Sequence, residues 1–195
     1  MEEITLGKNI LDFGGGKEAK YRHLIPCESY DSINIDPQIK PTWIIKVGEH
    51  FPSPKNYYDT VISLNTFEHI YDVHFTFKEI YKSLRPGGNF IFSTPFLYPI
   101  HAHPNDYIRP TNSWIKEALL NTGFKNIKIT SLIWGPFSTA LICLESKLQR
   151  KLMHLALFLD IFYLGQRLKR KNWHPNESDY PTGYFVEAQK ITLHI

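Results

Sequence analysis

Short apolar segments rich in β-branched residues alternate with segments of helical periodicity up to about residue 130. The apolar segments end in Gly, Asp or Asn, and the helical segments end in Gly or Pro. This alternation predicts βαβ units and a parallel sheet. The expected strands span residues 9–13, 30–35, 43–47, 59–64, 89–93, 126–130 and 183–190.

Two helices are expected between these strands, over residues 73–84 and 112–121. Arg85-Pro-Gly-Gly closes the first, and Gly123 stops the second. Residues 138–171 are expected to form one long or broken helix. A chain of 195 residues fits one domain, so we interpret residues 1–195 as a single domain with a helical insertion at about 138–171.

The first expected strand continues directly into Gly14, Gly15 and Gly16. Glycine permits a tight turn and lets backbone N–H groups approach a ligand closely. Asp36 ends the second strand, where its carboxylate can accept hydrogen bonds from ribose hydroxyls. These features predict a nucleotide-binding loop. Because Gly14, Gly16 and Ala19 also satisfy G-x-G-x-x-A, an NAD(P)-linked oxidoreductase stays open as an alternative.

Four sequence blocks follow one another in a recognisable order: LDFGGG from Leu11, YDTVISLNTFEHI from Tyr58, SLRPGGNFIFSTP from Ser83 and NTGFKNI from Asn121. Together they resemble the class I S-adenosylmethionine (SAM) dependent methyltransferases, and GYFVEAQK from Gly183 resembles the last strand of that family. The resemblance implies an α/β fold with a Rossmann-like, doubly wound sheet of seven strands, mostly parallel with an antiparallel last strand. It also implies SAM as the cofactor.

The same resemblance assigns a cofactor site to the loops that follow the first four strands. Its residues are Asp12, Gly14, Gly15, Gly16, Asp36, Pro37, Glu49 and Asn65. Asp12 and the glycines would line the methionine and ribose side of SAM, and Asp36 would hold the ribose hydroxyls. Pro37 and Glu49 would lie beside the adenine, and Asn65 would face the methionine portion or the methyl group.

Candidate catalytic residues follow the fourth and fifth strands, at the sheet edge where open α/β sheets hold ligands. SAM carries its own leaving group, so the protein must mainly align the acceptor and remove its proton. The candidates for this proton transfer are His101, His103, His69 and Glu68. A histidine suits the task because its pKa lies near neutrality.

Asp106, Tyr107 and Arg109 follow the two loop histidines and are expected to bind the acceptor, with Arg109 able to grip a carboxylate or phosphate. The alternatives are structural: Glu68 and His69 can cap the local backbone, and residues 101–109 can form a salt-bridged loop. His101, His103 and Asp106 could also bind a divalent metal, but histidines two residues apart without further ligand spacing are weak evidence, so no metal site is expected.

The string His-x-x-Pro-x-Asp-Tyr-x-Arg-x-Thr, from His101 to Thr111, is similar to one in a methyltransferase subgroup associated with cell-envelope and surface-glycan biosynthesis. This similarity implies O-methylation of a saccharide or a similar hydroxylated small molecule. A third hypothesis is a non-catalytic subunit with a SAM-binding fold that supports a partner.

Charge and composition narrow the partners only slightly. The net charge of +3 gives no reason to expect nucleic acid, and two distant cysteines suggest neither zinc nor disulfides. The acidic start lacks a secretory signal, so we expect a cytoplasmic enzyme.

The apolar stretch 152–164 is shorter than the roughly 20 residues that span a bilayer. Two hypotheses therefore remain for residues 138–171. The segment can pack over the active site or in a homodimer, or it can lie on the inner membrane face as an interfacial helix.

Overall fold

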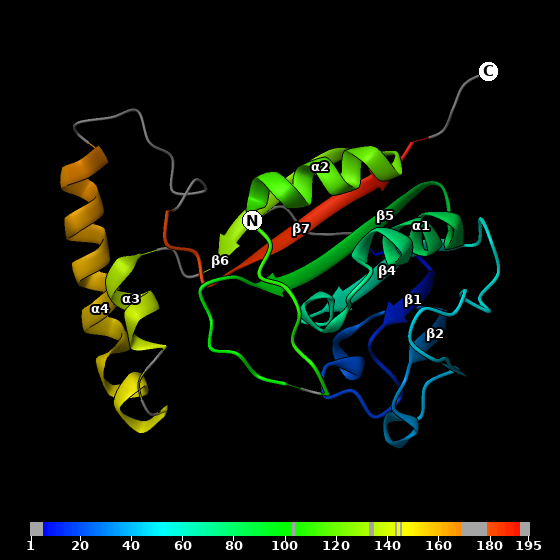
Figure 1. Ribbon diagram of the computed structural model, residues 1–195, viewed down its shortest axis with the longest axis horizontal. Helices are drawn as coiled ribbons and strands as arrows, with labels where there is room; N and C mark the ends of the chain where they lie inside the picture. The colour runs from blue at the N-terminus through cyan, green and yellow to red at the C-terminus, as the bar shows by residue number, and fades with distance from the viewer. Residues whose placement is uncertain are drawn as a thin grey trace.

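Buried apolar strands form a single mixed sheet in the computed structural model of the chain, which describes residues 6–102, 104–132, 135–142, 144, 146–168 and 179–191. The strand order within these residues is β3-β2-β1-β4-β5-β7-β6 (Figure 1). The strands are β1 (Asn9–Phe13), β2 (Ser29–Asn34), β3 (Trp43–Ile44), β4 (Tyr58–Leu64), β5 (Leu84–Pro95), β6 (Phe124–Leu132) and β7 (Gly183–Lys190). Strands β1 to β5 pair in parallel, and β7 runs antiparallel to both β5 and β6. The predicted fold class is confirmed.

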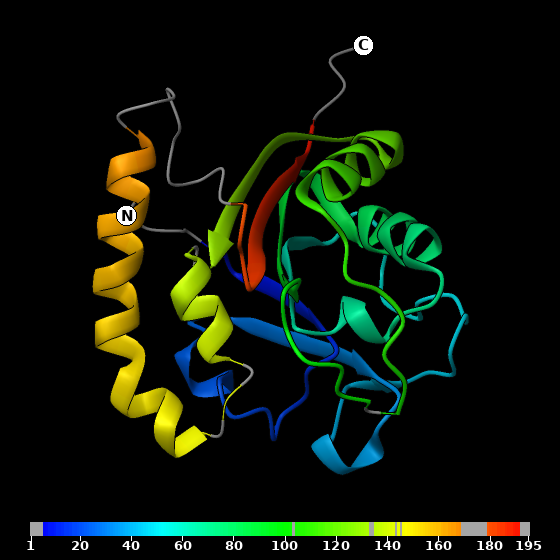
Figure 2. The same cartoon turned by 60° about the vertical axis from the view of Figure 1, so that its left-hand side comes forward.

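Two amphipathic helices, α1 (Val73–Ser83) and α2 (Asn112–Thr122), cover one face of the sheet (Figure 2). The Asp72 carboxylate accepts the Phe75 N–H at 2.9 Å to start α1. Helix α2 starts at Thr111, whose hydroxyl accepts the Trp114 N–H at 3.3 Å, and it ends at Gly123 with a φ of 109°. Between helices and sheet lies an aromatic core built from Phe67, Phe77, Phe90, Phe92 and Phe124.

Short 3-10 turns replace longer helices near the first strands. They are η1 (Arg22–Leu24), η2 (Pro37–Ile39) and η3 (Phe67–His69). On the face opposite α1 and α2, Ile10, Ile62 and Ile91 form a smaller cluster, against which Tyr21 and Tyr30 pack. The opposite face is therefore covered at the central strands β1, β4 and β5, whereas β6 is largely half-buried or exposed.

Helices α3 (Pro136–Leu141) and α4 (Ser146–Leu168) form a hairpin inserted between β6 and β7. Figures 1 and 2 show the hairpin standing beside the end of the sheet where β6 finishes and β7 starts. The expected insertion at 138–171 is thus a pair of helices, and residues 169–171 lie outside the described part. Among the described residues, no helix combines the length and apolar content needed to cross a membrane.

Two strand boundaries differ by more than two residues from those expected. β3 ends at Ile44 rather than at residue 47, because the Glu49 N–H donates to the Lys46 carbonyl at 3.1 Å and closes a turn there. β5 begins at Leu84, so Arg85-Pro-Gly-Gly belongs to the strand instead of forming only a helix stop. Leu84 pairs with Tyr58 of β4, which draws this segment into the sheet.

Lys190 fixes the end of β7 to the turn between α1 and β5. Its buried ammonium group donates to the carbonyls of Tyr81 at 2.7 Å and Leu84 at 2.8 Å, and to Asn56 Oδ1 at 2.8 Å. Burial lowers the pKa of this lysine. Three acceptors satisfy the three donors of the ammonium group, which makes its burial tolerable.

Replacement of Lys190 by Met should lower the free energy of unfolding by about 1–3 kcal/mol, because three buried acceptors lose their donor. Chemical denaturation would measure the change. Lys125→Met, on an exposed position of β6, is the matched control and should change stability by less than about 0.5 kcal/mol. Equal effects of the two substitutions would show that the buried contacts of Lys190 contribute nothing.

Candidate active site

The glycine loop follows β1 and is shaped by contacts with its own protein. Gly14 has a φ of 94°, and its N–H donates to the Ile33 carbonyl at 2.8 Å. A Cβ atom on Gly14 would lie 2.2 Å from Thr66 Oγ1, and one on Gly16 would lie 2.3 Å from the Ile39 carbonyl oxygen. Both glycines are therefore required for packing, in addition to the close ligand approach expected from the sequence.

Asp12 lies behind this loop with no exposed surface. The hydroxyls of Tyr30 and Tyr21 donate to its Oδ2 at 2.6 and 2.9 Å. Burial raises the pKa of Asp12 from its ordinary 3.8 to about 6. A Cβ atom on Gly15 would lie 1.8 Å from Asp12 Oδ2. The structure thus places Asp12 where it supports the loop from the inside.

Asp36 lies just beyond the carboxyl end of β2, one strand away from the glycine loop. Its Oδ1 accepts the Gln38 N–H at 2.8 Å, which caps η2, and its own N–H donates to Asn34 Oδ1 at 2.9 Å. The side-chain amide of Asn34 donates in turn to the Gly14 carbonyl. Asn34 therefore ties Asp36 to the glycine loop, a role that the sequence analysis missed although Asn34 stands two residues before Asp36.

Three further residues expected at the cofactor site lie on loops of the same sheet edge. Pro37 is the first residue of η2, and Glu49 is exposed and accepts the Lys46 N–H at 2.8 Å. Asn65 follows β4 with a φ of 49°, and its Oδ1 accepts the Ser93 hydroxyl at 2.9 Å. Asn65 is thereby held where the ends of β4 and β5 meet.

The order of strands reverses between β1 and β4, since the chain passes from β1 to β2 on one side and from β4 to β5 on the other. In an open α/β sheet, ligands bind outside the carboxyl ends of the strands at this reversal. The glycine loop after β1 and Asn65 after β4 flank that position, so the structure brings both parts of the expected cofactor site together.

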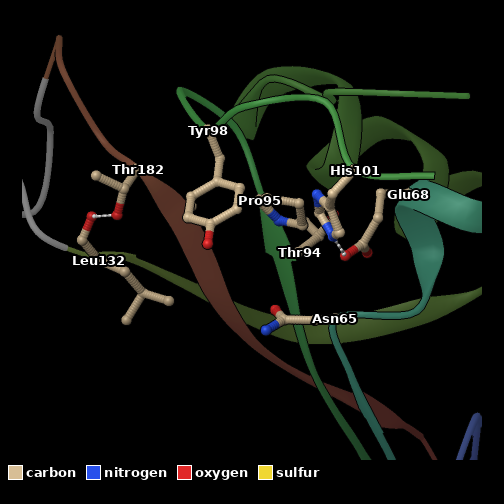
Figure 3. A pocket seen from close by; sticks show the side chains of 9 residues that line it. Asn65, Glu68, Thr94, Pro95, Tyr98, His101, Leu132 and Thr182 are labelled. Atoms are coloured by element: carbon tan, nitrogen blue, oxygen red, sulfur yellow. Dashed lines mark hydrogen bonds and ion pairs between the residues drawn. The ribbon is translucent and has the colours of Figure 1, made fainter. Parts of the chain in front are cut away.

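A cavity of about 220 Å³ lies next to Asn65 and contains two of the candidate catalytic residues (Figure 3). Its lining residues are Asn65, Glu68, Thr94, Pro95, Tyr98, His101, Leu132, Thr182 and Gly183. The sequence analysis missed Thr94, Leu132 and Thr182. For Leu132 and Thr182 the sequence held one indication, the antiparallel last strand, because the end of β6 and the start of such a β7 must meet at the same sheet edge.

Glu68 is fully buried beside the cavity, and neither of its carboxylate oxygens has a hydrogen-bond partner within the described residues. Its Oε1 lies 3.6 Å from His101 Nε2 and 3.8 Å from His69 Nε2. Burial raises the pKa of Glu68, whereas the two histidines act in the opposite direction.

Backbone carbonyls lie beside the other ring nitrogen of both histidines. His69 Nδ1 lies 2.5 Å from the Asn105 carbonyl, and His101 Nδ1 lies 3.1 Å from the Pro99 carbonyl. When each Nδ1–H donates there, Nε2 keeps its lone pair and can accept a proton. Of the two, His101 is the more exposed, with 42% of its side chain accessible against 16% for His69. His103 lies outside the described residues.

The loop that carries His101 is held by an ion pair and by η3. Arg109 donates through both terminal nitrogens to Asp106, and Asp106 Oδ2 also accepts the His101 N–H at 3.0 Å. The Arg109 hydrogen bond lowers the pKa of Asp106 to about 2. The Tyr107 N–H donates to the Glu68 carbonyl at 2.7 Å. Asp106 and Arg109 thus position His101, and Tyr107 remains half-exposed beside Tyr71.

Glu68, His69 and His101 also form a group that could hold a metal ion, because one ligand atom from each lies within 4.8 Å of the others. Two imidazoles and a carboxylate are ligands that zinc and related metals accept. His101 and His103 were weighed from the sequence, but the structure brings His101 together with Glu68 and His69 instead.

Comparison with known protein families gives a match over more than half of the chain. The family model described as "Methyltransferase domain" matches residues 2–129. No curated protein sequence matches the chain.

Solved structures share the fold at low sequence identity. Phosphoethanolamine N-methyltransferase 2 of Haemonchus contortus, solved with SAM, matches with a TM-score of 0.62 and 16% identity over 98% of this chain and 50% of its own. The chain thus spans half the length of that enzyme. A SAM-dependent methyltransferase of Mesorhizobium loti matches with a TM-score of 0.60 and 17% identity over 94% and 92% of the two chains.

A putative methyltransferase of Haloferax volcanii, solved with the Trm112 methyltransferase activator, matches with a TM-score of 0.62 and 16% identity over 98% of this chain and 86% of its own. At these identities the structural matches establish the fold.

Asp12 should make the stability of the protein fall as the pH rises. Because its pKa is higher in the folded chain, folding binds a proton between pH 3.8 and about 6. The stabilisation is complete below pH 3.8 and is lost as the pH rises through about 6. Relative to Asp12→Asn, the wild-type free energy of unfolding should therefore fall by up to about 3 kcal/mol between pH 4 and pH 7.

Denaturation at several pH values would measure this difference. Asp31→Asn is the matched control, since Asp31 also accepts a tyrosine hydroxyl, from Tyr58 at 2.9 Å, but is only partly buried. Its change in stability reports the loss of a tyrosine–carboxylate hydrogen bond at a partly buried position. A flat difference for Asp12→Asn would mean that Asp12 titrates normally in the folded chain.

Proposed function

The chain belongs to the methyltransferase domain family and is a SAM-dependent methyltransferase, and we propose that it methylates a hydroxyl oxygen of a saccharide or a similar small acceptor in cell-envelope glycan biosynthesis. The family match leaves no support for the oxidoreductase alternative. The observation that carries the proposal is the pairing of His101 with the buried Glu68 at one wall of the cavity.

The residues at the strand reversal fit SAM. The glycine loop and the carboxylate of Asp36 lie at neighbouring strand ends, where a dinucleotide-binding fold holds phosphate or sugar groups. We assign the ribose hydroxyls to Asp36 and the adenine side to Pro37 and Glu49. Gly14, Gly15, Gly16 and Asn65 would contact the remainder of the cofactor, and Asp12 would act through the loop it supports.

Bound SAM supplies an activated methyl group and a neutral thioether leaving group, which leaves proton removal to the protein. We assign this step to His101. Its Nε2 would accept the proton of the acceptor hydroxyl as the oxygen forms its bond to the methyl carbon. Glu68, 3.6 Å from Nε2, would stabilise the resulting imidazolium, and His69 would share the same carboxylate. His103 stays a second candidate for the base.

The cavity suits a small, polar acceptor. Its volume of about 220 Å³ is below the roughly 300–1,000 Å³ of pockets that take drug-sized ligands. Thr94 contributes a buried hydroxyl that has no hydrogen-bond partner within the described residues. Asp106 and Arg109 would set the position of the loop, and Tyr107 would contact the part of the acceptor that extends outward.

Asp36→Ala should weaken SAM binding at least tenfold, because the ribose loses hydrogen bonds to a charged group worth roughly 1.5–3 kcal/mol each. Calorimetric titration with SAM would measure the affinity. Asp72→Ala is the matched control, since Asp72 also caps a helix, but at the start of α1 and outside the expected cofactor site. Unchanged affinity in a folded Asp36→Ala protein would remove Asp36 from the cofactor site.

His101→Ala should reduce methyl transfer by about 10²–10⁴-fold while SAM affinity stays near wild type, because only proton removal is lost. Transfer from labelled SAM to free and nucleotide-linked sugars would be measured together with calorimetric SAM binding. Glu68→Gln should also slow transfer, and His74→Ala, an exposed histidine on α1, should have no effect. Wild-type turnover in His101→Ala would make the loop a scaffold and move the base to another candidate.

Proton transfer without a metal makes a separate prediction. Turnover should survive incubation with EDTA, because proton transfer from the acceptor hydroxyl to His101 needs no metal ion. Loss of activity that zinc or manganese restores would instead assign Glu68, His69 and His101 to a metal ion.

A further inference from the structure

Helix α4 exposes a row of large apolar side chains to solvent. Leu155, Phe158, Ile161 and Phe162 are 55–64% exposed, and Leu148 is 47% exposed. Leu148, Leu155, Phe158 and Phe162 follow each other at helical spacing, so they share one face of the helix. Figure 2 shows α4 beyond α3 and away from the sheet. An apolar surface of this extent indicates a binding partner.

Buried hydrogen bonds hold α3 and α4 together in the hairpin. The buried carboxylate of Asp160 accepts the N–H groups of Phe137 at 2.8 Å and Ser138 at 3.0 Å, which joins α4 to the start of α3. A Cβ atom on Gly135 would lie 1.9 Å from Asp160 Cγ, so this contact is tight. Asp160 is the only acidic residue in 146–171, and it faces inward.

Basic residues precede and follow the apolar row. Lys147, Arg150 and Lys151 are exposed in the first turns of α4, and Arg167, Lys169, Arg170 and Lys171 follow in the sequence. Seven basic residues against one acidic residue give residues 146–171 a charge of +6. The whole chain carries +3, so the remainder is net negative at −3. Positive charge is therefore concentrated on the segment that exposes apolar side chains.

We propose that α4 docks on an anionic phospholipid surface, with its apolar row in the headgroup region and its basic residues on lipid phosphates. A second copy of the chain fits this charge pattern less well. Two segments that each carry a charge of +6 would repel one another if they were paired.

Docking through α4 would hold the cavity close to the membrane. The hairpin is the chain between β6 and β7, and Leu132, Thr182 and Gly183, which flank it, line the cavity. A lipid-linked acceptor could then reach the active site from the bilayer surface. The docking itself is independent of the proposed acceptor, because it rests on the charge and exposure of α4 alone.

Sedimentation with phosphatidylglycerol–phosphatidylcholine vesicles tests the proposal on the full chain. The wild-type protein should bind these vesicles, and it should bind neutral phosphatidylcholine vesicles at least tenfold more weakly, with binding reduced by salt. Phe158→Ser with Phe162→Ser, and separately Lys147→Glu with Lys151→Glu, should each lower the partition coefficient at least tenfold. Leu24→Ser, which removes an apolar side chain 69% exposed on η1, is the matched control.

Calorimetric titration with SAM would be run on every variant. Retained SAM binding would show that the variant is folded, so that a loss of vesicle binding reports on docking and not on the proposed function. Absence of binding to anionic vesicles would overturn the proposal. So would a wild-type dimer in analytical ultracentrifugation that the Phe158→Ser, Phe162→Ser variant dissociates, because a second copy would then cover the apolar row.

Discussion

The connections that follow β1 and β4 lead in opposite directions along the sheet, so they diverge at the carboxyl ends of these two neighbouring strands. The glycine loop, Asp36 and Asn65 all lie on connections that start at this edge. The crevice between the connections cannot be filled by a helix, since both neighbouring crossovers turn away from it. The arrangement of strands therefore creates a binding position before any particular side chain is considered.

Two buried carboxylates near this edge, Asp12 and Glu68, differ in the hydrogen bonds that they receive. Asp12 is stabilised by two tyrosine hydroxyls and holds the glycine loop from behind, so its burial contributes to the shape of the site. Within the part of the chain that the structure describes, Glu68 has no such donors, and it faces two imidazoles at a distance too long for a hydrogen bond. An uncompensated buried carboxylate is costly, and such costs are found where charge is used in a reaction. The contrast supports the proposal that Asp12 has a supporting role and that Glu68 takes part in the reaction.

The active-site loop and the helical hairpin both belong to the part of the sheet around β5, β6 and β7. The Asp106–Arg109 ion pair and the contacts with η3 fix the loop. The Asp160 contacts fix the hairpin. In each case a carboxylate that accepts from nearby donors gives rigidity to a segment outside the sheet. The described parts of the loop and the hairpin are therefore tied to neighbouring segments, although they are connections rather than strands.

The sequence by itself determined the strands, the two covering helices and the glycine loop with Asp36, because these follow from apolar periodicity, turn residues and local spacing. Only the tertiary structure decided that Glu68 contacts His101, that Arg109 is bound to Asp106, and that Asp12 is buried by Tyr21 and Tyr30. It also turned Asp160 inward and left the apolar face of α4 exposed. Such contacts depend on which strand ends meet in space, and periodicity along a chain carries no information about that.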